Sequence, residues 1–126
     1  MFAVKVILSA EIHPSEDPQK VRQAVLNIVD PRDTPEVSVH EDMVTVRAGE
    51  FTLGRIVESA KDKNAIPAFL KLVNAGRGGV HRLMFNRQAA HAGRIIMCDD
   101  PLESPLGPIY LSINDEALRY IISHTK

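Results

Sequence analysis

Apolar and polar residues alternate along the first part of the chain. Apolar side chains occupy every second position from Phe2 to Ile12, and polar residues such as Ser9 and Glu11 lie between them. A period of two is typical of a β-strand that buries one face and leaves the other in water. This segment therefore predicts an N-terminal strand over residues 2–12.

Four later segments carry apolar residues at helical spacing, which places their side chains on one face of a helix. The four apolar stripes are Val21, Ala24, Val25 and Ile28; Leu53, Ile56, Val57 and Ala60; Ile66, Phe69, Leu70 and Val73; and Ala117, Leu118, Ile121 and Ile122. Each stripe predicts a helix that packs against a core.

Capping residues mark where these helices begin and end. Asp17, followed directly by proline, predicts the start of the first helix. Asn64 and Asp115 are expected to cap the third and the last helix. Asn86 and Gly93 bracket a short helix, with a cap at one end and a left-handed stop at the other.

Short runs rich in β-branched residues predict the other strands, at residues 37–41, 43–48, 80–85, 94–98 and 108–113. Only a tight turn at Glu41 and Asp42 separates the first two, which is too short for a crossover connection. We therefore expect one α+β domain over residues 1–126, with helices packed on one face of a partly antiparallel sheet.

Charge is distributed unevenly along the chain, although the formal net charge is only −1. Residues 1–62 carry a net charge of −4 and residues 99–126 a net charge of −3, whereas residues 63–98 carry +6 and contain no acidic residue. The basic residues of this stretch are Lys63, Lys71, Arg77, Arg82, Arg87 and Arg94. An acid-free basic stretch is a candidate for contacts with a phosphate backbone.

Composition narrows the possible settings. The one cysteine, Cys98, cannot form an intramolecular disulfide, which fits a cytoplasmic location. No apolar run approaches the roughly 20 residues that a membrane span requires. With two Tyr, four Phe and no Trp, the chain does not favour a dense aromatic platform for stacking single-stranded bases.

Two C-terminal segments, LMFNRQAAHAGRI at 83–95 and ESPLGPI at 103–109, resemble motifs of the archaeal uncharacterised protein family 0201. The opening strand, which runs into HPSED at 13–17 and then KVRQAVLNI, is similar to the start of that family. The resemblance implies a fold like that of the ribosomal protein that binds 5S ribosomal RNA. It also implies RNA binding, a homodimer and no catalytic residue.

The matching motif residues are Asn86, Arg87, Gln88, Ala89 and Ala90, followed by Pro105, Leu106, Gly107 and Pro108. Arg87 stands where the family usually has lysine, which keeps the charge and adds a planar fork suited to phosphate. Residues 58–69 lack the Arg- and Gln-bearing helix expected from the family, so an RNA contact from that helix has less support.

The resulting hypothesis is a non-catalytic RNA-binding protein that contacts the phosphate backbone through residues 63–98. Its candidate contacts are Lys71, Arg77, Arg82, Arg87, Gln88, His91 and Arg94. The alternative is a solvated surface whose arginines pair with acidic residues from the two flanks. Within this stretch, Asn86 is best explained as a helix cap, and the GRGG loop at 76–79 as a helix stop with a turn.

Two other classes of function stay open. Asp99, Asp100 and Glu103 could hold Mg²⁺ in a hydrolytic or nucleotide-processing enzyme, although acidic residues are ordinary in such a loop. Cys98 beside two carboxylates is better explained as core filler than as a nucleophile. The histidines show no metal-ligand spacing, so a zinc site has no support, and no cofactor is predicted. A structural dimer that serves as a protein-interaction subunit is the third class.

Overall fold

The computed structural model of the 126-residue chain describes residues 4–74, 78–98, 100–103 and 106–125. In chain order, the elements are β1 (Val6–Glu11), α1 (Pro18–Leu26), the 3-10 helix η1 (Pro31–Asp33), β2 (Glu36–His40), β3 (Met43–Ala48), α2 (Glu50–Asp62), α3 (Ile66–Val73), β4 (Val80–Phe85), α4 (Arg87–His91), β5 (Met97–Cys98), the 3-10 helix η2 (Pro101–Glu103), β6 (Ile109–Asn114) and α5 (Asp115–His124).

The six strands form one sheet in the order β2-β3-β1-β6-β4-β5, and each neighbouring pair is antiparallel. The first and last strands of the chain lie side by side in the middle of the sheet, with Val6 opposite Ile113 and Leu8 opposite Leu111. The predicted α+β fold is confirmed, and the sheet is antiparallel throughout its described strands.

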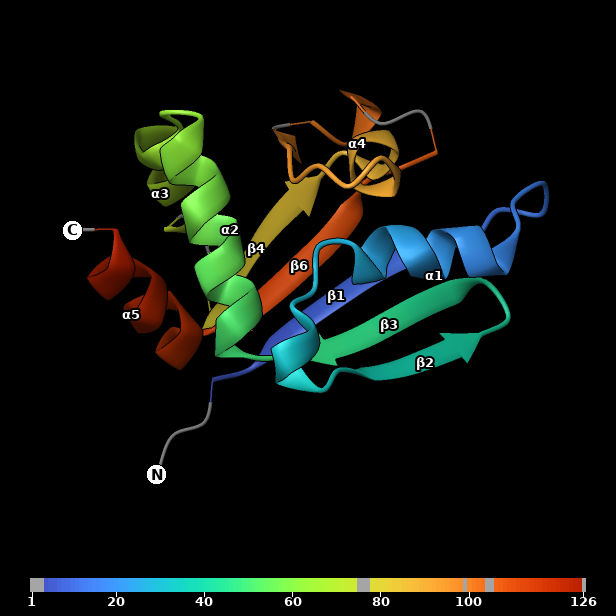
Figure 1. Cartoon of the computed structure of the whole chain (residues 1–126), viewed down its shortest axis with the longest axis horizontal. Coiled ribbons are helices and arrows are strands. Elements are labelled where there is room, and N and C mark those ends of the chain that lie inside the picture. Colours follow the sequence, from blue (N-terminus) through green and yellow to red (C-terminus); the bar gives the residue numbers. More distant parts are fainter. Residues whose placement is uncertain (1–3, 75–77, 99, 104–105, 126) are drawn as a thin grey trace.

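The helices lie on one side of this sheet (Figure 1). The alternation that predicted the first strand places Val6, Leu8 and Ala10 in the core, and β3 adds Val44 and Val46 beside them. The helical stripes cover the same side, because their apolar residues belong to the same buried cluster. The opposite face of the sheet carries the intervening side chains, which are mostly polar or half-buried.

Three capping predictions are confirmed. The Asp17 side chain accepts the Gln19 N–H at 2.9 Å at the start of α1. The Asn86 side chain accepts the Ala89 N–H at 2.9 Å at the start of α4. Gly93 has a φ of 84°, the left-handed conformation that ends a helix and that residues with a Cβ rarely adopt.

Two other caps differ from the prediction. Asn64 has a φ of 53° and ends α2 instead of starting α3. Across it, the Ala65 N–H donates to the Ala60 carbonyl at 2.8 Å, the bond that closes a left-handed helix end. Asp115 is the first residue of α5, and the preceding Asn114 is the cap, with its side chain accepting an N–H of the first turn at 3.0 Å.

The strand predicted over 94–98 is much shorter than expected. Only Met97 and Cys98 pair with β4, because β4 ends at Phe85 and the chain turns into α4. Cys98 is buried, as expected of core filler. Of the helices described, none combines the length and the apolar character needed to cross a bilayer.

Candidate nucleic-acid interface

The basic and polar residues predicted to bind RNA do not form one surface. Lys71 is exposed on α3, and Arg82 is exposed on β4 on the sheet face away from the helices. Gln88 and His91 are exposed on α4 and line a small pocket against α1. Arg94 follows α4 and faces a different, larger groove.

Arg87 is buried, with 5% of its surface exposed. Its Nη1 donates to both carboxylate oxygens of Glu16, at 2.8 and 3.0 Å, and Glu16 also accepts the His13 N–H at 3.0 Å. A phosphate could reach this guanidinium only by breaking a buried ion pair, which is costly. Arg87 therefore does not fit the predicted role of a backbone contact. Arg77 lies outside the described residues.

The motif at 86–90 instead holds α4 against α1. Its first residue caps α4, and Ala90 is buried at the contact with α1. Asn27, at the end of α1, donates from Nδ2 to the Ala90 carbonyl at 2.9 Å. Gly107 of the second motif has a φ of 85°, the conformation expected for its turn. The described parts of both motifs thus have structural roles.

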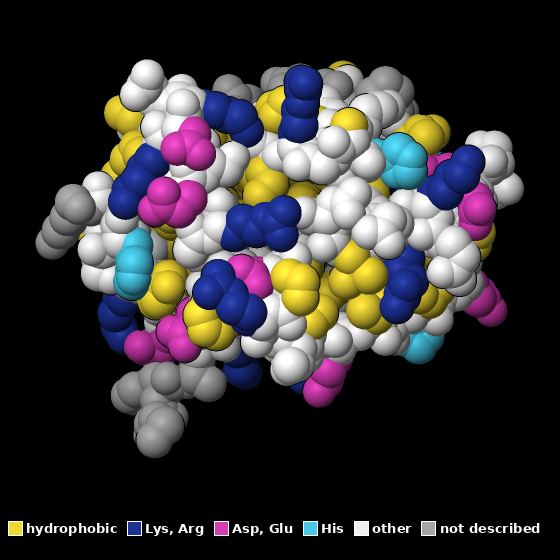
Figure 2. Space-filling model, in the orientation of Figure 1, with side chains coloured by type: hydrophobic (Ala, Val, Ile, Leu, Met, Phe, Trp, Pro, Cys, Tyr) yellow, Lys and Arg dark blue, Asp and Glu magenta, His cyan; other side chains and the backbone are white. Residues whose placement is uncertain are grey.

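A groove of about 710 Å³ runs over the exposed side of α2. Its walls come from η1, α2, the turn after α4, and α5. The charged residues that line it are Arg32, Arg55, Lys61, Lys63 and Arg94, together with Asp30, Glu58 and Asp62. Figure 2 shows dark-blue Lys and Arg side chains and magenta carboxylates interspersed across this face, and five cations and three carboxylates line the groove. The groove therefore has an excess of positive charge.

Three of these cations, two from α2 and its C-terminal end and one from the turn after α4, have no ion-pair partner within the described residues. Arg55 is exposed and donates from Nη1 to the Val29 carbonyl at 3.2 Å. The Nζ of Lys63 donates to the Ser59 hydroxyl at 3.0 Å and to a backbone carbonyl of the turn after α4. Arg94 is exposed in that same turn. Their charges are therefore available to an anion in the groove.

Two of the acidic residues are already paired with cations of the groove. Asp30 accepts hydrogen bonds from Nε and Nη2 of Arg32, at 2.8 to 3.2 Å. These bonds lower the pKa of Asp30 from 3.8 to about 2. Glu58 lies 3.7 Å from the Lys61 ammonium in an exposed i,i+3 pair, which contributes little to stability.

Asp33 fixes the end of the groove where η1 meets α2. Its carboxylate accepts the N–H of Phe51 at 3.1 Å and both the N–H and the hydroxyl of Thr52, at 2.8 and 2.6 Å. These are groups of the first turn of α2, so Asp33 serves as the cap that Gly49 cannot provide. A Cβ at Gly49 would lie 2.9 Å from the Asp33 Oδ1, so glycine allows this approach.

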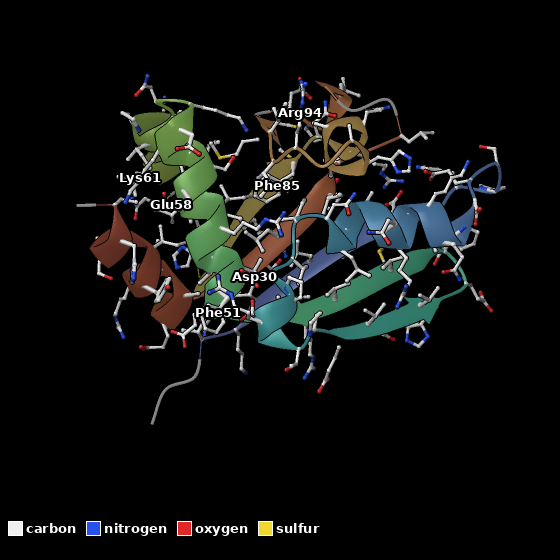
Figure 3. All side chains as sticks on the ribbon, viewed as in Figure 1. Asp30, Phe51, Glu58, Lys61, Phe85 and Arg94 are labelled. Atoms are coloured by element: carbon white, nitrogen blue, oxygen red, sulfur yellow. The ribbon has the colours of Figure 1, made fainter. Side chains whose placement is uncertain are left out.

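Four flat side chains line the groove in two stacked pairs. The Arg32 guanidinium lies over the Phe51 ring, with its Cζ 4.3 Å from the ring centroid. The Tyr120 and His124 rings of α5 stack with centroids 3.9 Å apart. Burial, followed by the charges of Glu50 and Asp33, raises the pKa of Tyr120. Figure 3 shows Asp30 and Phe51 at one end of the groove and Arg94 towards the other.

The predicted carboxylate site is only partly described. Asp100 is exposed, and its Oδ1 accepts the Leu102 N–H at 2.9 Å, as in an ordinary turn. Asp99 and the Glu103 side chain lie outside what the structure describes. Within the described part of the chain, no three His, Cys, Asp or Glu side chains gather in a way that could hold a metal ion.

The sequence comparisons give two close relatives. A UPF0201 protein of Sulfurisphaera tokodaii is 33% identical over 112 residues, which cover 86% of this chain and 77% of the relative. A UPF0201 protein of Methanopyrus kandleri is 32% identical over 123 residues, which cover 89% and 76% of the two chains. No protein-family model matches the chain.

The fold also has a solved counterpart. The crystal structure of a UPF0201 protein from Methanococcus jannaschii matches 96% of this chain and 92% of its own, with a TM-score of 0.70. Sequence identity between the two chains is 21%, so the match supports the fold and nothing finer.

Proposed function

The chain belongs to the UPF0201 protein family, and we propose that it is a non-catalytic protein whose groove over α2 binds the phosphate backbone of RNA. The observation that carries this proposal is the convergence of Arg55, Lys63 and Arg94 around one groove. Arg55 and Lys63 come from α2 and its C-terminal end, Arg94 comes from the turn after α4, and none of the three forms an ion pair among the residues described. RNA, and not another polyanion, follows from the sequence resemblance, which implies RNA binding.

The groove suits a flexible, repeated anion better than a single small one. Its lining cations come from three separate segments, which are η1, α2 with its C-terminal end, and the turn after α4. Arg94 and Lys63 border the turn after α4, whereas Arg55 lies nearer to η1. Successive phosphates of one strand could each meet one of these cations and release a counterion.

The remaining acidic residues limit the strength of binding. Asp62 and Glu58 line the same groove, so the local potential is only moderately positive. We therefore expect binding that is strong at low ionic strength and weak near physiological salt, where charges separated by more than about 8 Å are screened. The cytoplasm, which the single cysteine favours, is the proposed location.

The direct test is RNA binding by a triple variant in which Arg55→Gln, Lys63→Gln and Arg94→Gln remove the three cations. Fluorescence anisotropy with a labelled RNA would measure the dissociation constant at low salt. Each exposed contact is expected to contribute about 0.5 kcal/mol, so the triple variant should bind about tenfold more weakly.

A matched control removes three exposed cations that lie outside the groove. Lys20→Gln, Lys71→Gln and Arg119→Gln change the net charge by the same amount, all three lie on helices, and Lys71 belongs to the surface predicted from the sequence. Near wild-type affinity in the control is the expected result. If the control variant lost affinity and the groove variant did not, the groove would be the wrong surface.

We also propose that the chain forms a homodimer, as the sequence resemblance implies. The sheet face away from the helices supports this, because no described helix covers it and it presents the half-buried side chains of Ile7, Met84 and Tyr110. The likeness to the 5S-RNA-binding ribosomal fold remains part of the same proposal. Sedimentation equilibrium over a range of protein concentrations tests the dimer, and a mass of 13.9 kDa throughout would contradict it.

A further inference from the structure

We propose that the Arg32–Phe51 end of the groove stacks an unpaired base, so that the ligand of the groove is single-stranded RNA. This inference rests on the proposed function and adds the class of RNA. Its basis is a layered arrangement of a ring, a guanidinium plane and a carboxylate, all on the groove wall.

The Arg32 side chain is held as a flat plate. Asp30 accepts two of its N–H groups at one edge, and the Phe51 ring lies beneath it at 4.3 Å. Asp33 holds Phe51 in turn, because its carboxylate accepts the Phe51 N–H. The plate is therefore fixed from its edge and from below before any ligand arrives.

The other side of this plate faces solvent. The Arg32 side chain is 68% exposed, although its edge and inner face are engaged. Arginine planes and aromatic rings are the groups on which proteins stack unpaired RNA bases. A preorganised plate loses little conformational freedom when a base binds, which favours this use.

Charge distinguishes Arg32 from the backbone-binding cations of the groove. Its carboxylate partner, only 12% exposed, neutralises it locally and raises its pKa. Arg55, Lys63 and Arg94 have no such partner within the described chain. A phosphate would therefore prefer these three, and the surface that Arg32 still offers is its flat face.

A second stacked pair lies on the same groove. The Tyr120 and His124 rings are 3.9 Å apart and nearly parallel, at 23°. His124 is exposed, so its outer face is open to solvent. The few aromatic side chains of the chain thus gather in part beside the cations, which the scarcity of aromatics in the sequence does not suggest. Cations with flat platforms are the usual composition of single-strand binding surfaces.

Duplex RNA could not use such a plate, because its bases are already stacked inside the helix. The experiment therefore compares a labelled oligouridine of roughly 10 nucleotides, within known single-strand site sizes, with a duplex of the same length. Anisotropy titrations would use wild type, Arg32→Lys and Phe51→Leu. Arg32→Lys keeps the charge and removes the plane, and Phe51→Leu keeps an apolar support and removes the ring.

Wild type should bind oligouridine more tightly than duplex. Each variant should lose about 5- to 150-fold in affinity for oligouridine, the range that corresponds to one stacked base, and change little towards duplex. Arg119→Lys, which removes a similarly exposed, carboxylate-paired guanidinium that does not line the groove, is the matched control and should bind like wild type. Urea unfolding of each variant would show that the fold is retained.

NMR provides a second readout that does not depend on variants. On addition of oligouridine, the ring current of a stacked base should shift the Arg32 Hε signal upfield, whereas inorganic phosphate should not. If Arg32→Lys and Phe51→Leu bind oligouridine as wild type does and the Hε signal does not move, base stacking is refuted. The proposed function fails separately, if the variant lacking Arg55, Lys63 and Arg94 retains wild-type affinity for both RNAs.

Discussion

Replacing Arg87 tests whether this residue stabilises the fold or binds RNA. A structural role predicts a loss of stability, and a binding role predicts a loss of RNA affinity. In Arg87→Met, an unbranched apolar chain replaces the stem and the carboxylate of Glu16 loses its cation. Both side chains are largely buried, with 6% and 12% exposed. Breaking a buried ion pair from one side costs about 3–5 kcal/mol. Glu16 keeps its hydrogen bond from the His13 N–H, so we expect a loss of about 3 kcal/mol.

Urea unfolding followed by circular dichroism would measure this loss, which corresponds to a melting temperature lower by roughly 10 °C. The double variant Glu16→Gln with Arg87→Met is the control, because it removes both charges. It should be more stable than Arg87→Met alone, since no uncompensated carboxylate remains buried. RNA affinity measured well below the melting temperature should be unchanged.

A small loss of stability would contradict the structural role of Arg87. A loss below about 0.5 kcal/mol is what a surface substitution gives. If Arg87→Met lost so little stability and bound RNA more weakly, Arg87 would be a ligand contact, as its sequence position suggested. The assignment of Arg87 to the packing of α4 would then be wrong.

Three further predictions concern the groove and its supports. Gly49→Ala should lower the free energy of unfolding by about 1 kcal/mol, because the new Cβ would displace the Asp33 carboxylate that caps α2. An unchanged free energy of unfolding would contradict this capping role of Asp33. The carbon-13 signal of the Asp30 carboxyl should titrate near pH 2, because Arg32 stabilises the charged form. Since its folded pKa is lowered, the pair stabilises the protein above pH 3.8, and this stability is lost as pH falls towards about 2; a midpoint near 3.8 would contradict the pairing. Asn86→Ala should cost about 1 kcal/mol in urea unfolding through loss of the α4 cap, and no loss would refute the capping role.

Local patterns predicted most elements of the fold because their causes are local. Alternation over β1 follows from one buried and one exposed sheet face, and the caps at Asp17 and Asn86 act within three residues of themselves. Asn64 was assigned to the wrong helix because the same residue type suits a helix start and a left-handed helix end. The choice depended on where α2 stopped, which the sequence alone left undetermined.

The burial of Arg87 could not be predicted locally. Its partner Glu16 is 71 residues away, and the two meet only because α1 packs against α4. A count of charges along the chain finds no acidic residue between 63 and 98, and this suggests that all the basic side chains of the stretch are exposed to solvent. In the fold, its members separate: Arg82 faces one side of the sheet, Arg94 the other, and Arg87 neither.

The groove was missed for the same reason. Arg55 and Lys61 lie in a segment of net negative charge, so a count by segment gave them no weight. The helical stripe of Leu53, Ile56 and Val57 could have indicated this surface. It predicts which side of the helix is buried, and Arg55 and Lys61 lie outside that buried side. The contribution of Arg32 depended on its contacts with Asp30 and Phe51, which only the fold provides.

The most direct test of RNA binding in the groove is the salt dependence of RNA affinity for wild type and for the variant lacking the groove cations Arg55, Lys63 and Arg94. Each phosphate contact with single-stranded RNA contributes about 0.7 to the slope of log affinity against log salt concentration. We predict that wild type binds oligouridine with a clear negative slope, and that the triple variant has a slope smaller by about two. Equal slopes for the two proteins, or no measurable affinity of wild type at low salt, would contradict the proposal that this groove binds an RNA backbone.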